Sequence, residues 1–187
     1  MTICLVGSEM CIRDSPRVML KKQIKELSRK GLIMKSGVEC EYFLISPDGD
    51  SIADPRDTQS KPCYDQSALM RRYDLIKEIC DCMIEMGWGP YQNDHEDANG
   101  QFEMNWDYSD CLETADRHTF FKYMVKTIAE KHGLRATFMP KPFNNLTGNG
   151  CHAHVSVWQG KKNMFLDKSD KLCLLYTSDA ADEVVRV

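Results

Sequence analysis

The stretch that decides the fold is GVECEYFLI, residues 37–45. Its valine, aromatic residues and isoleucine favour a β-strand, and side chains along a strand alternate between its two faces. Glu39 and Glu41 therefore share one face, about 7 Å apart. The pattern predicts a strand that carries two neighbouring carboxylates and continues into a hydrophobic run. On its own, such a pair is more typical of a solvated strand edge than of a binding site.

The rest of the chain mixes amphipathic helices with short strands. Because the order lacks a regular strand–helix–strand rhythm, we expect an α+β fold with a mostly antiparallel sheet and flanking helices. The expected helices have their apolar stripes at 20–27, in a segment that stops at Gly31, at 69–83, with Ser67 as N-cap and Gly87 just past the end, and at 116–132. The other expected strands are 91–97, 101–107, 136–139 and 151–158.

The segment 91–106 contains Asn99-Gly100, which is the strongest short-range signal for a two-residue hairpin turn. With these two residues as the turn, Glu96 lies directly opposite Glu103. Like charges in that position destabilise a hairpin unless something positive lies between them, and a divalent cation is the natural candidate. A surface hairpin with another register is the alternative.

Histidines occur in a third strand-like segment, 148–158, where His152, His154 and Ser156 fall on one face. The glycines before them allow the backbone to approach a ligand closely. Imidazole beside several carboxylates suits Mg²⁺ or Mn²⁺, whereas a structural zinc site favours thiolates at short paired spacings. The three motifs together indicate a metal site, although a lone His-x-His is a weak signal.

Composition excludes several classes of protein. The chain has 187 residues and a formal net charge of −4. It contains no apolar run of about 20 residues that would span a bilayer, and no basic block that would neutralise nucleic-acid phosphates. Its nine cysteines are odd in number and irregular in spacing, which argues against a secreted disulfide scaffold. We expect reduced thiols, a cytoplasmic protein, and no membrane or nucleic-acid partner.

Both ends of the chain are interpreted as translated sequencing-adapter sequence. One codon choice for residues 10–14, taken with the last two bases of Glu9 and the first base of Ser15, has a reverse complement that reads CLLYTS, which is the sequence of residues 173–178. An inverted repeat of this kind is expected of an adapter-flanked insert. We therefore expect residues 1–15 and 172–187 to be adapter-derived and residues 16–171 to be the authentic protein.

The first two motifs, then ATFMPKP at 136–142, then the histidine motif follow one another in an order and approximate spacing that resemble the catalytic domain of the glutamine synthetase family, over nearly all of residues 16–171. Segments 95–106 and 143–154 look most like the bacterial type III branch, which includes γ-glutamylmethylamide synthetases. The resemblance implies an ATP-dependent ligase that joins glutamate and ammonia through γ-glutamyl phosphate. Methylamine is the alternative amine.

The resemblance also implies roles for individual residues, among them the ligands of two Mg²⁺ or Mn²⁺ ions, with ATP as co-substrate. The expected ligands are Glu41, Glu96 and Glu103 for the first ion and Glu39 and His152 for the second, with His154 and Ser156 contacting ATP and Gly148 contacting glutamate. No catalytic residue is assigned.

By the same resemblance, residues 16–171 form the N-terminal portion of the catalytic domain of a ring-shaped homo-oligomer. The groups that complete the site lie outside this portion in the family, so we expect the chain to be inactive alone. Two alternatives from other functional classes remain. One is a cupin-like metal-binding β-domain, and the other is a non-catalytic protein whose carboxylates are solvated.

Overall fold

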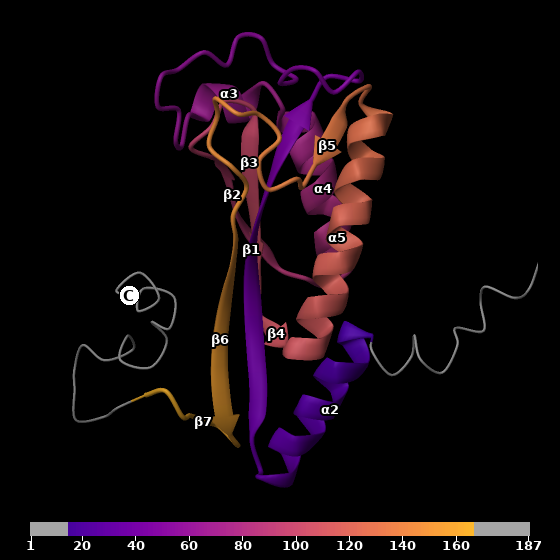
Figure 1. Cartoon of the computed structure of the whole chain (residues 1–187), viewed down its shortest axis with the longest axis vertical. Helices are drawn as coiled ribbons and strands as arrows, with labels where there is room; N and C mark the ends of the chain where they lie inside the picture. Colours follow the sequence, from indigo (N-terminus) through magenta and orange to yellow (C-terminus); the bar gives the residue numbers. More distant parts are fainter. Residues whose placement is uncertain (1–14, 167–187) are drawn as a thin grey trace, which may run out of the picture. The chain divides into compact units, whose positions relative to one another are not determined.

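The computed structural model describes residues 15–166, so the segments interpreted as adapter lie outside the described residues except for Ser15. The chain divides into two compact units (Figure 1). The larger contains residues 37–108 and 116–153, and the described part of the smaller contains 15–36, 109–115 and 154–166. No helix within 15–166 is long and apolar enough to cross a membrane.

The elements confirm the predicted α+β class, because helices are combined with antiparallel strand pairs. Every predicted strand and all three predicted helical regions are present, with shifted ends. The elements are α2 (Pro16–Arg29), β1 (Ile33–Ile45), α3 (Gln66–Met70), α4 (Tyr73–Glu85), β2 (Pro90–His95), β3 (Gln101–Trp106), β4 (Ser109–Asp110), α5 (Cys111–Lys131), β5 (Arg135–Thr137), β6 (Cys151–Gln159) and β7 (Lys162–Asn163).

The core of the larger unit lies on one face of its sheet, where alternate residues of β1 and β3 pack against α4 and α5. Tyr42 of β1 is opposite Phe102 of β3, and both are almost fully buried. Phe121 of α5 packs edge-on against Tyr42, with 6.2 Å between the ring centroids. Burial of several large aromatic rings in one cluster stabilises this face strongly.

The strand pleat places the acidic residues on the other face of the same sheet. The odd-numbered Glu39 and Glu41 alternate with the buried even-numbered residues of β1. On β3, Glu103 lies directly opposite Glu41, and Asn105 lies opposite Glu39. The predicted shared face of Glu39 and Glu41 is therefore present, and it is the face turned away from α4 and α5.

The second predicted helix is interrupted. It forms the short α3 and the longer α4, and the N-cap of α3 is Asp65, whose side chain accepts a hydrogen bond from the backbone of Ser67 at 2.9 Å. The prediction of Ser67 as the N-cap was wrong. The interruption falls at Arg71 and Arg72, whose side chains bind the preceding loop: Arg71 forms an ion pair with the buried Asp54. This tertiary contact is invisible to helical periodicity.

The predicted hairpin register was wrong by two residues, because Asp94, and not Glu96, lies opposite Glu103. A two-residue type I′ turn requires a positive φ at both central positions. Gly100 has φ +74°, but Asn99 does not have a positive φ. Asn99 and Gly100 instead form a turn within a longer loop that includes Glu96.

The buried Asp57 holds this loop in place from a distant part of the sequence. Its carboxylate accepts hydrogen bonds from the side chain of Asn99 at 2.9 Å and from the backbone of Gly100 at 2.7 Å. It also lies 2.6 Å from Nε2 of His95, and both side chains of that pair are almost inaccessible to solvent. Three partners on one carboxylate fix the end of the hairpin.

The smaller unit combines α2 with the start of β1, β4, most of β6, and β7. Strand β4 pairs with β1 at Lys35 and Ser36, and β7 pairs with the end of β6. Lys35 places its ammonium 5.3 Å from the centre of the Trp158 ring. Within the described residues α2 contains no fully buried side chain.

Candidate metal centre

Three carboxylates meet near the loop that joins β2 and β3 in the larger unit. Asp94 comes from β2, Glu96 from the loop that follows it, and Glu103 from β3, and one oxygen of each lies within 4.8 Å of the other two. Glu103 is only 9% exposed. Three negative groups at this distance repel one another unless a cation lies between them.

The charges on this trio are incompletely compensated. Burial, followed by the charges of Glu103, Glu41 and Asp94, raises the pKa of Glu96 from 4.5 to about 7. Burial and the neighbouring carboxylates also raise the pKa of Glu103, although the hydrogen bond from Asn105 at 2.9 Å acts in the opposite direction. A carboxylate trio with one buried and two half-buried members is a suitable oxygen ligand set for Mg²⁺ or Mn²⁺.

Glu41 lies beside the trio and is held in a defined orientation. Its Oε2 accepts hydrogen bonds from Nε2 of Gln101 at 2.7 Å and from the backbone of Gly150 at 2.8 Å. Gln101 also donates to the carbonyl oxygen of Gly148 at 2.9 Å. The glutamine therefore connects the predicted glutamate-binding loop to the predicted metal ligand.

Both glycines of this loop lie in places where a side chain would make a close contact. A Cβ at Gly150 would lie 2.7 Å from Oε1 of Glu41. A Cβ at Gly148 would lie 2.4 Å from the carbonyl oxygen of Pro140. The first clash involves the end of a flexible side chain, whereas the second involves backbone that cannot move alone.

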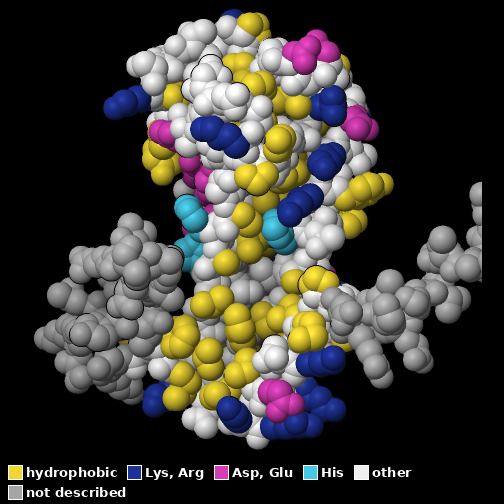
Figure 2. Space-filling model, viewed as in Figure 1, with side chains coloured by type: hydrophobic (Ala, Val, Ile, Leu, Met, Phe, Trp, Pro, Cys, Tyr) yellow, Lys and Arg dark blue, Asp and Glu magenta, His cyan; other side chains and the backbone are white. Residues whose placement is uncertain are grey.

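Glu39 and His152 form a second pair on neighbouring strands, with 3.1 Å between Oε2 of Glu39 and Nδ1 of His152. The hydrogen bond to Glu39 raises the pKa of His152, and the charges of Glu39, Glu41 and Glu103 add to this effect. Acidic and histidine side chains also lie next to each other on the face shown in Figure 2. The second predicted ligand pair is therefore assembled beside the first ligand group.

All five residues predicted as metal ligands lie in the larger unit, and each contacts or electrostatically affects others of the set. The sequence prediction missed Asp94. The signal was present, because Asp94 and Glu96 are two residues apart in a predicted strand and so share a face. The wrong hairpin register concealed it by pairing Glu96 with Glu103.

The two residues predicted to contact ATP lie further along β6, in the smaller unit. Ser156 accepts a hydrogen bond from the indole of Trp158 at 2.8 Å, and His154 is exposed. Their contact with a nucleotide stays a prediction.

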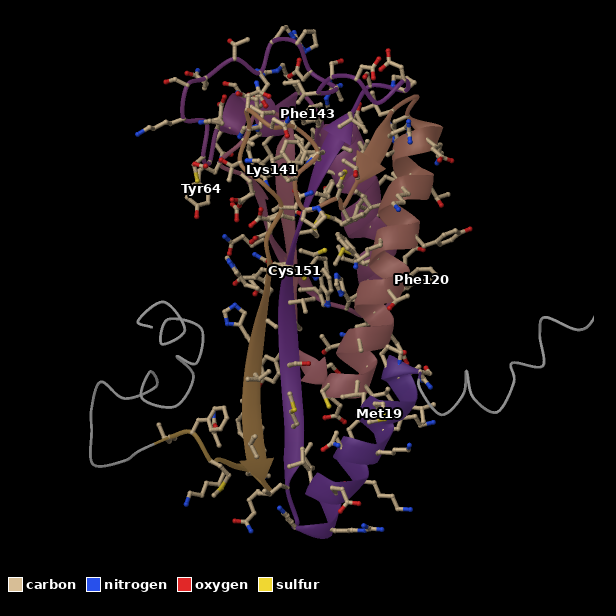
Figure 3. The ribbon with its side chains drawn as sticks, in the orientation of Figure 1. Met19, Tyr64, Phe120, Lys141, Phe143 and Cys151 are labelled. Carbon is tan, nitrogen blue, oxygen red and sulfur yellow. The ribbon has the colours of Figure 1, made fainter. Side chains whose placement is uncertain are left out.

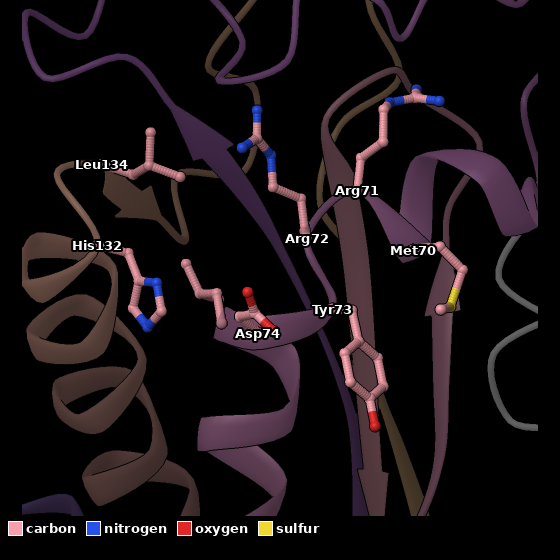
Figure 4. A pocket seen from close by; sticks show the side chains of 8 residues that line it. Met70, Arg71, Arg72, Tyr73, Asp74, His132 and Leu134 are labelled. Carbon is pink, nitrogen blue, oxygen red and sulfur yellow. The ribbon is translucent and has the colours of Figure 1, made fainter.

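A cavity of about 350 Å³ lies elsewhere in the larger unit, beside the junction of α3 and α4 (Figure 4). Its lining contains none of the predicted site residues. It is lined by Met70, Arg71, Arg72, Tyr73, Asp74, Leu75, His132 and Leu134.

Comparison with known proteins places these features in one family. The model of the family described as "Glutamine synthetase, catalytic domain" matches residues 13–184. The glutamine synthetase of Rhizobium meliloti (strain 1021) is 68% identical over 158 residues, which are 83% of this chain and 36% of that protein. The glutamate–methylamine ligase of Methyloversatilis universalis is 46% identical over 157 residues, again 83% and 36% of the two chains.

A solved structure titled "GmaS/ADP complex-Conformation 1" has a TM-score of 0.80 and 67% sequence identity, and the match covers 81% of this chain and 36% of that one. The chain thus spans little more than a third of the length of the relatives that it matches.

Proposed function

We propose, since the chain belongs to the glutamine synthetase catalytic-domain family, that it supplies the metal-binding part of the active site of an ATP-dependent glutamate–amine ligase. The observation that carries the proposal is the convergence of the carboxylates of Asp94, Glu96 and Glu103 within 4.8 Å on the sheet face opposite the core. In the reaction, ATP phosphorylates the γ-carboxylate of glutamate, and the amine then displaces phosphate.

The first ion would be held by Glu41, Glu96 and Glu103, with Asp94 within reach as a further oxygen ligand. Because Gln101 and the backbone of Gly150 both donate to Oε2 of Glu41, Oε1 of this side chain is the oxygen left to face a cation. A bound dication offsets the negative charge of carboxylate and phosphate groups brought together in the reaction.

The second ion would be held by Glu39 and His152. When Nδ1 of His152 donates its proton to Glu39, the lone pair of the ring is on Nε2 and can bind a metal ion. A metal-binding histidine usually donates its other ring N–H to a carboxylate in this way. Nε2 lies 3.6 Å from the position of a Cβ on Gly150, on the side of Glu41. Glu39 thus orients His152 and also contributes charge to the site.

The substrates are proposed on the similarity to the named relatives. One relative, 67% identical, is described by its title as an ADP complex, which supports ATP as co-substrate. His154 and Ser156 are proposed as its contacts on the family resemblance of their segment. Glutamate would meet the backbone of Gly148, which Gln101 holds against Glu41.

Ammonia is the amine that we propose, on the 68% identity to a glutamine synthetase. Methylamine is the alternative, supported by the 46% identity to a glutamate–methylamine ligase. An enzyme that contains this chain, assayed with each amine at equal concentration, decides between them. We further propose that such an enzyme is a cytoplasmic homo-oligomeric ring.

The test of the proposed function is a coupled titration of the chain with Mn²⁺ and ATP, followed by the electron paramagnetic resonance signal of unbound Mn²⁺. We expect Mn²⁺ to bind, and ATP to increase its affinity. Mn²⁺ binding that ATP does not change would favour the cupin-like reading. If no Mn²⁺ binds, the carboxylates are solvated surface and the proposal is wrong.

A further inference from the structure

A second group of metal-binding side chains lies on the helix-facing side of the sheet in the larger unit. Cys40 of β1 is 2% exposed and belongs to the hydrophobic core. Cys151 begins β6, and Figure 3 labels it beside β1. His118, from α5, places Nε2 at 3.3 Å from Sγ of Cys40 and 3.7 Å from Sγ of Cys151. All three ligand atoms lie within 4.8 Å of one another.

These distances match the spacing of ligand atoms around a tetrahedral zinc ion. With a Zn–S distance of about 2.3 Å and a Zn–N distance of about 2.05 Å, the sulfur and nitrogen atoms of such a site are about 3.6 Å apart. The two sulfur–nitrogen distances around His118 lie on either side of this value. Little rearrangement of the side chains would be needed to admit the ion.

The ligand types also differ from those of the carboxylate centre. Two thiols and one imidazole form a soft donor set that favours Zn²⁺ over Mg²⁺ or Mn²⁺, which prefer oxygen. Three protein ligands leave the fourth position of a tetrahedral ion open. Cys151 is exposed, which gives the ion a route from solvent, while Cys40 is buried.

We propose that Cys40, His118 and Cys151 form a binding site for Zn²⁺ that is distinct from the carboxylate centre. Both cysteines are adjacent in sequence to proposed ligands of that centre. Cys40 lies between Glu39 and Glu41, and Cys151 directly precedes His152. The alternation of side chains along β1 separates the two donor sets onto opposite faces of one strand. Zn²⁺ binding at the thiol site does not depend on the proposed ligase function.

The experiment uses the full chain, kept reduced, with Cys4, Cys11 and Cys173 replaced by serine so that only the six described cysteines remain. Excess Mg²⁺ is present to occupy oxygen ligands. Co²⁺ is the spectroscopic probe, because thiolate ligation gives a charge-transfer absorption in the near ultraviolet and tetrahedral geometry gives intense visible bands. Zn²⁺ is then added to displace Co²⁺.

We expect one equivalent of Co²⁺ to produce both absorptions and one equivalent of Zn²⁺ to remove them. Loss of a partner that only orients a ligand costs roughly 10- to 100-fold in metal affinity. Cys151→Ser and His118→Gln each lose a ligand itself, so their affinity should fall by at least the upper end of that range. Cys63→Ser and Cys82→Ser are the matched controls, because neither cysteine belongs to the cluster, and both should bind as the parent does. Absence of the charge-transfer absorption, or its survival in Cys151→Ser, would overturn the proposal.

A second measurement on the unsubstituted protein avoids any question of variant folding. Zn²⁺ should slow alkylation of Cys151 by iodoacetamide at least tenfold, as followed by mass spectrometry, and leave alkylation of the exposed Cys63 unchanged. Equal rates with and without Zn²⁺ at Cys151 would contradict the site. Because neither readout involves Mn²⁺, ATP or turnover, failure here is distinguishable from failure of the proposed ligase function.

Discussion

Replacing Glu96 by glutamine should have opposite effects on stability with and without a divalent cation. In the metal-free protein, the change removes one charge from a trio of mutually repelling carboxylates, and the fold should become more stable. With Mn²⁺ present, the same change removes a ligand, and most of the stabilisation by the ion should be lost. Few other mechanisms produce this reversal of sign.

The size of the effect follows from the pKa of Glu96, which is raised from 4.5 to about 7. Each pKa unit corresponds to about 1.4 kcal/mol, so ionising this group in the fold costs at most about 3 kcal/mol. Partial solvent screening reduces the cost to about 1 to 2 kcal/mol. At pH 8 without metal, the Glu96→Gln variant should therefore unfold about 3 to 6 °C higher than the parent chain.

The assay is thermal unfolding followed by circular dichroism, at pH 8, in EDTA and then in Mn²⁺. At a concentration about 100 times the dissociation constant, Mn²⁺ should stabilise the parent chain by about 2.7 kcal/mol, and Glu96→Gln by much less. Glu85→Gln, the same substitution at an exposed position of α4, is the control and should change neither midpoint. A lower midpoint for Glu96→Gln in EDTA would refute the reasoning.

Further predictions concern pH, the loop glycines and Asp57. The free energy of unfolding of the metal-free protein should fall as pH rises from 5 to 8, because the folded Glu96 keeps its proton up to about pH 7 whereas the unfolded carboxyl ionises near 4.5. Urea titrations at several pH values measure this free energy. A free energy that rises across this range would contradict the prediction. Gly150→Ala should weaken Mn²⁺ binding about tenfold or more with little change in stability, because its Cβ meets only the end of the Glu41 side chain. Gly148→Ala should destabilise the fold by about 1 to 3 kcal/mol, because its Cβ clashes with backbone. Calorimetry measures the Mn²⁺ affinity and urea unfolding measures the stability, and the reverse pattern would contradict the site geometry. Asp57→Ala should lower the free energy of unfolding by about 3 to 5 kcal/mol, since it leaves the buried His95 and the backbone N–H of Gly100 without their hydrogen-bond acceptor. Hydrogen exchange at Gly100 should become faster, and unchanged exchange would contradict the prediction.

The alternation of residue types predicted the carboxylate face of β1 correctly, because the period of a strand is a local property. Glu39 and Glu41 needed no tertiary information to be placed on one face. The hairpin register was wrong because the local preference of Asn99-Gly100 for a tight turn is overridden by Asp57, which lies 42 residues away from Asn99. Glu96 was therefore assigned the strand position that Asp94 occupies.

The division of the second helix was missed for a similar reason. The apolar stripe continues across the junction, but Arg71 and Arg72 bind the loop at Asp54 and end α3 there. The cluster of Cys40, His118 and Cys151 was not predicted either, because its members come from three elements far apart in sequence. Only the packing of α5 against β1 and β6 in the larger unit brings them together.

The most direct test of the central claim is the location of bound Mn²⁺ by anomalous X-ray scattering from crystals of the chain grown with the ion and ADP. We predict an anomalous peak within coordination distance, about 2.0 to 2.3 Å, of carboxylate oxygens of Glu96 and Glu103. An ordered Mn²⁺ ion found only at other carboxylates, with these two side chains hydrated or turned apart, would contradict the account.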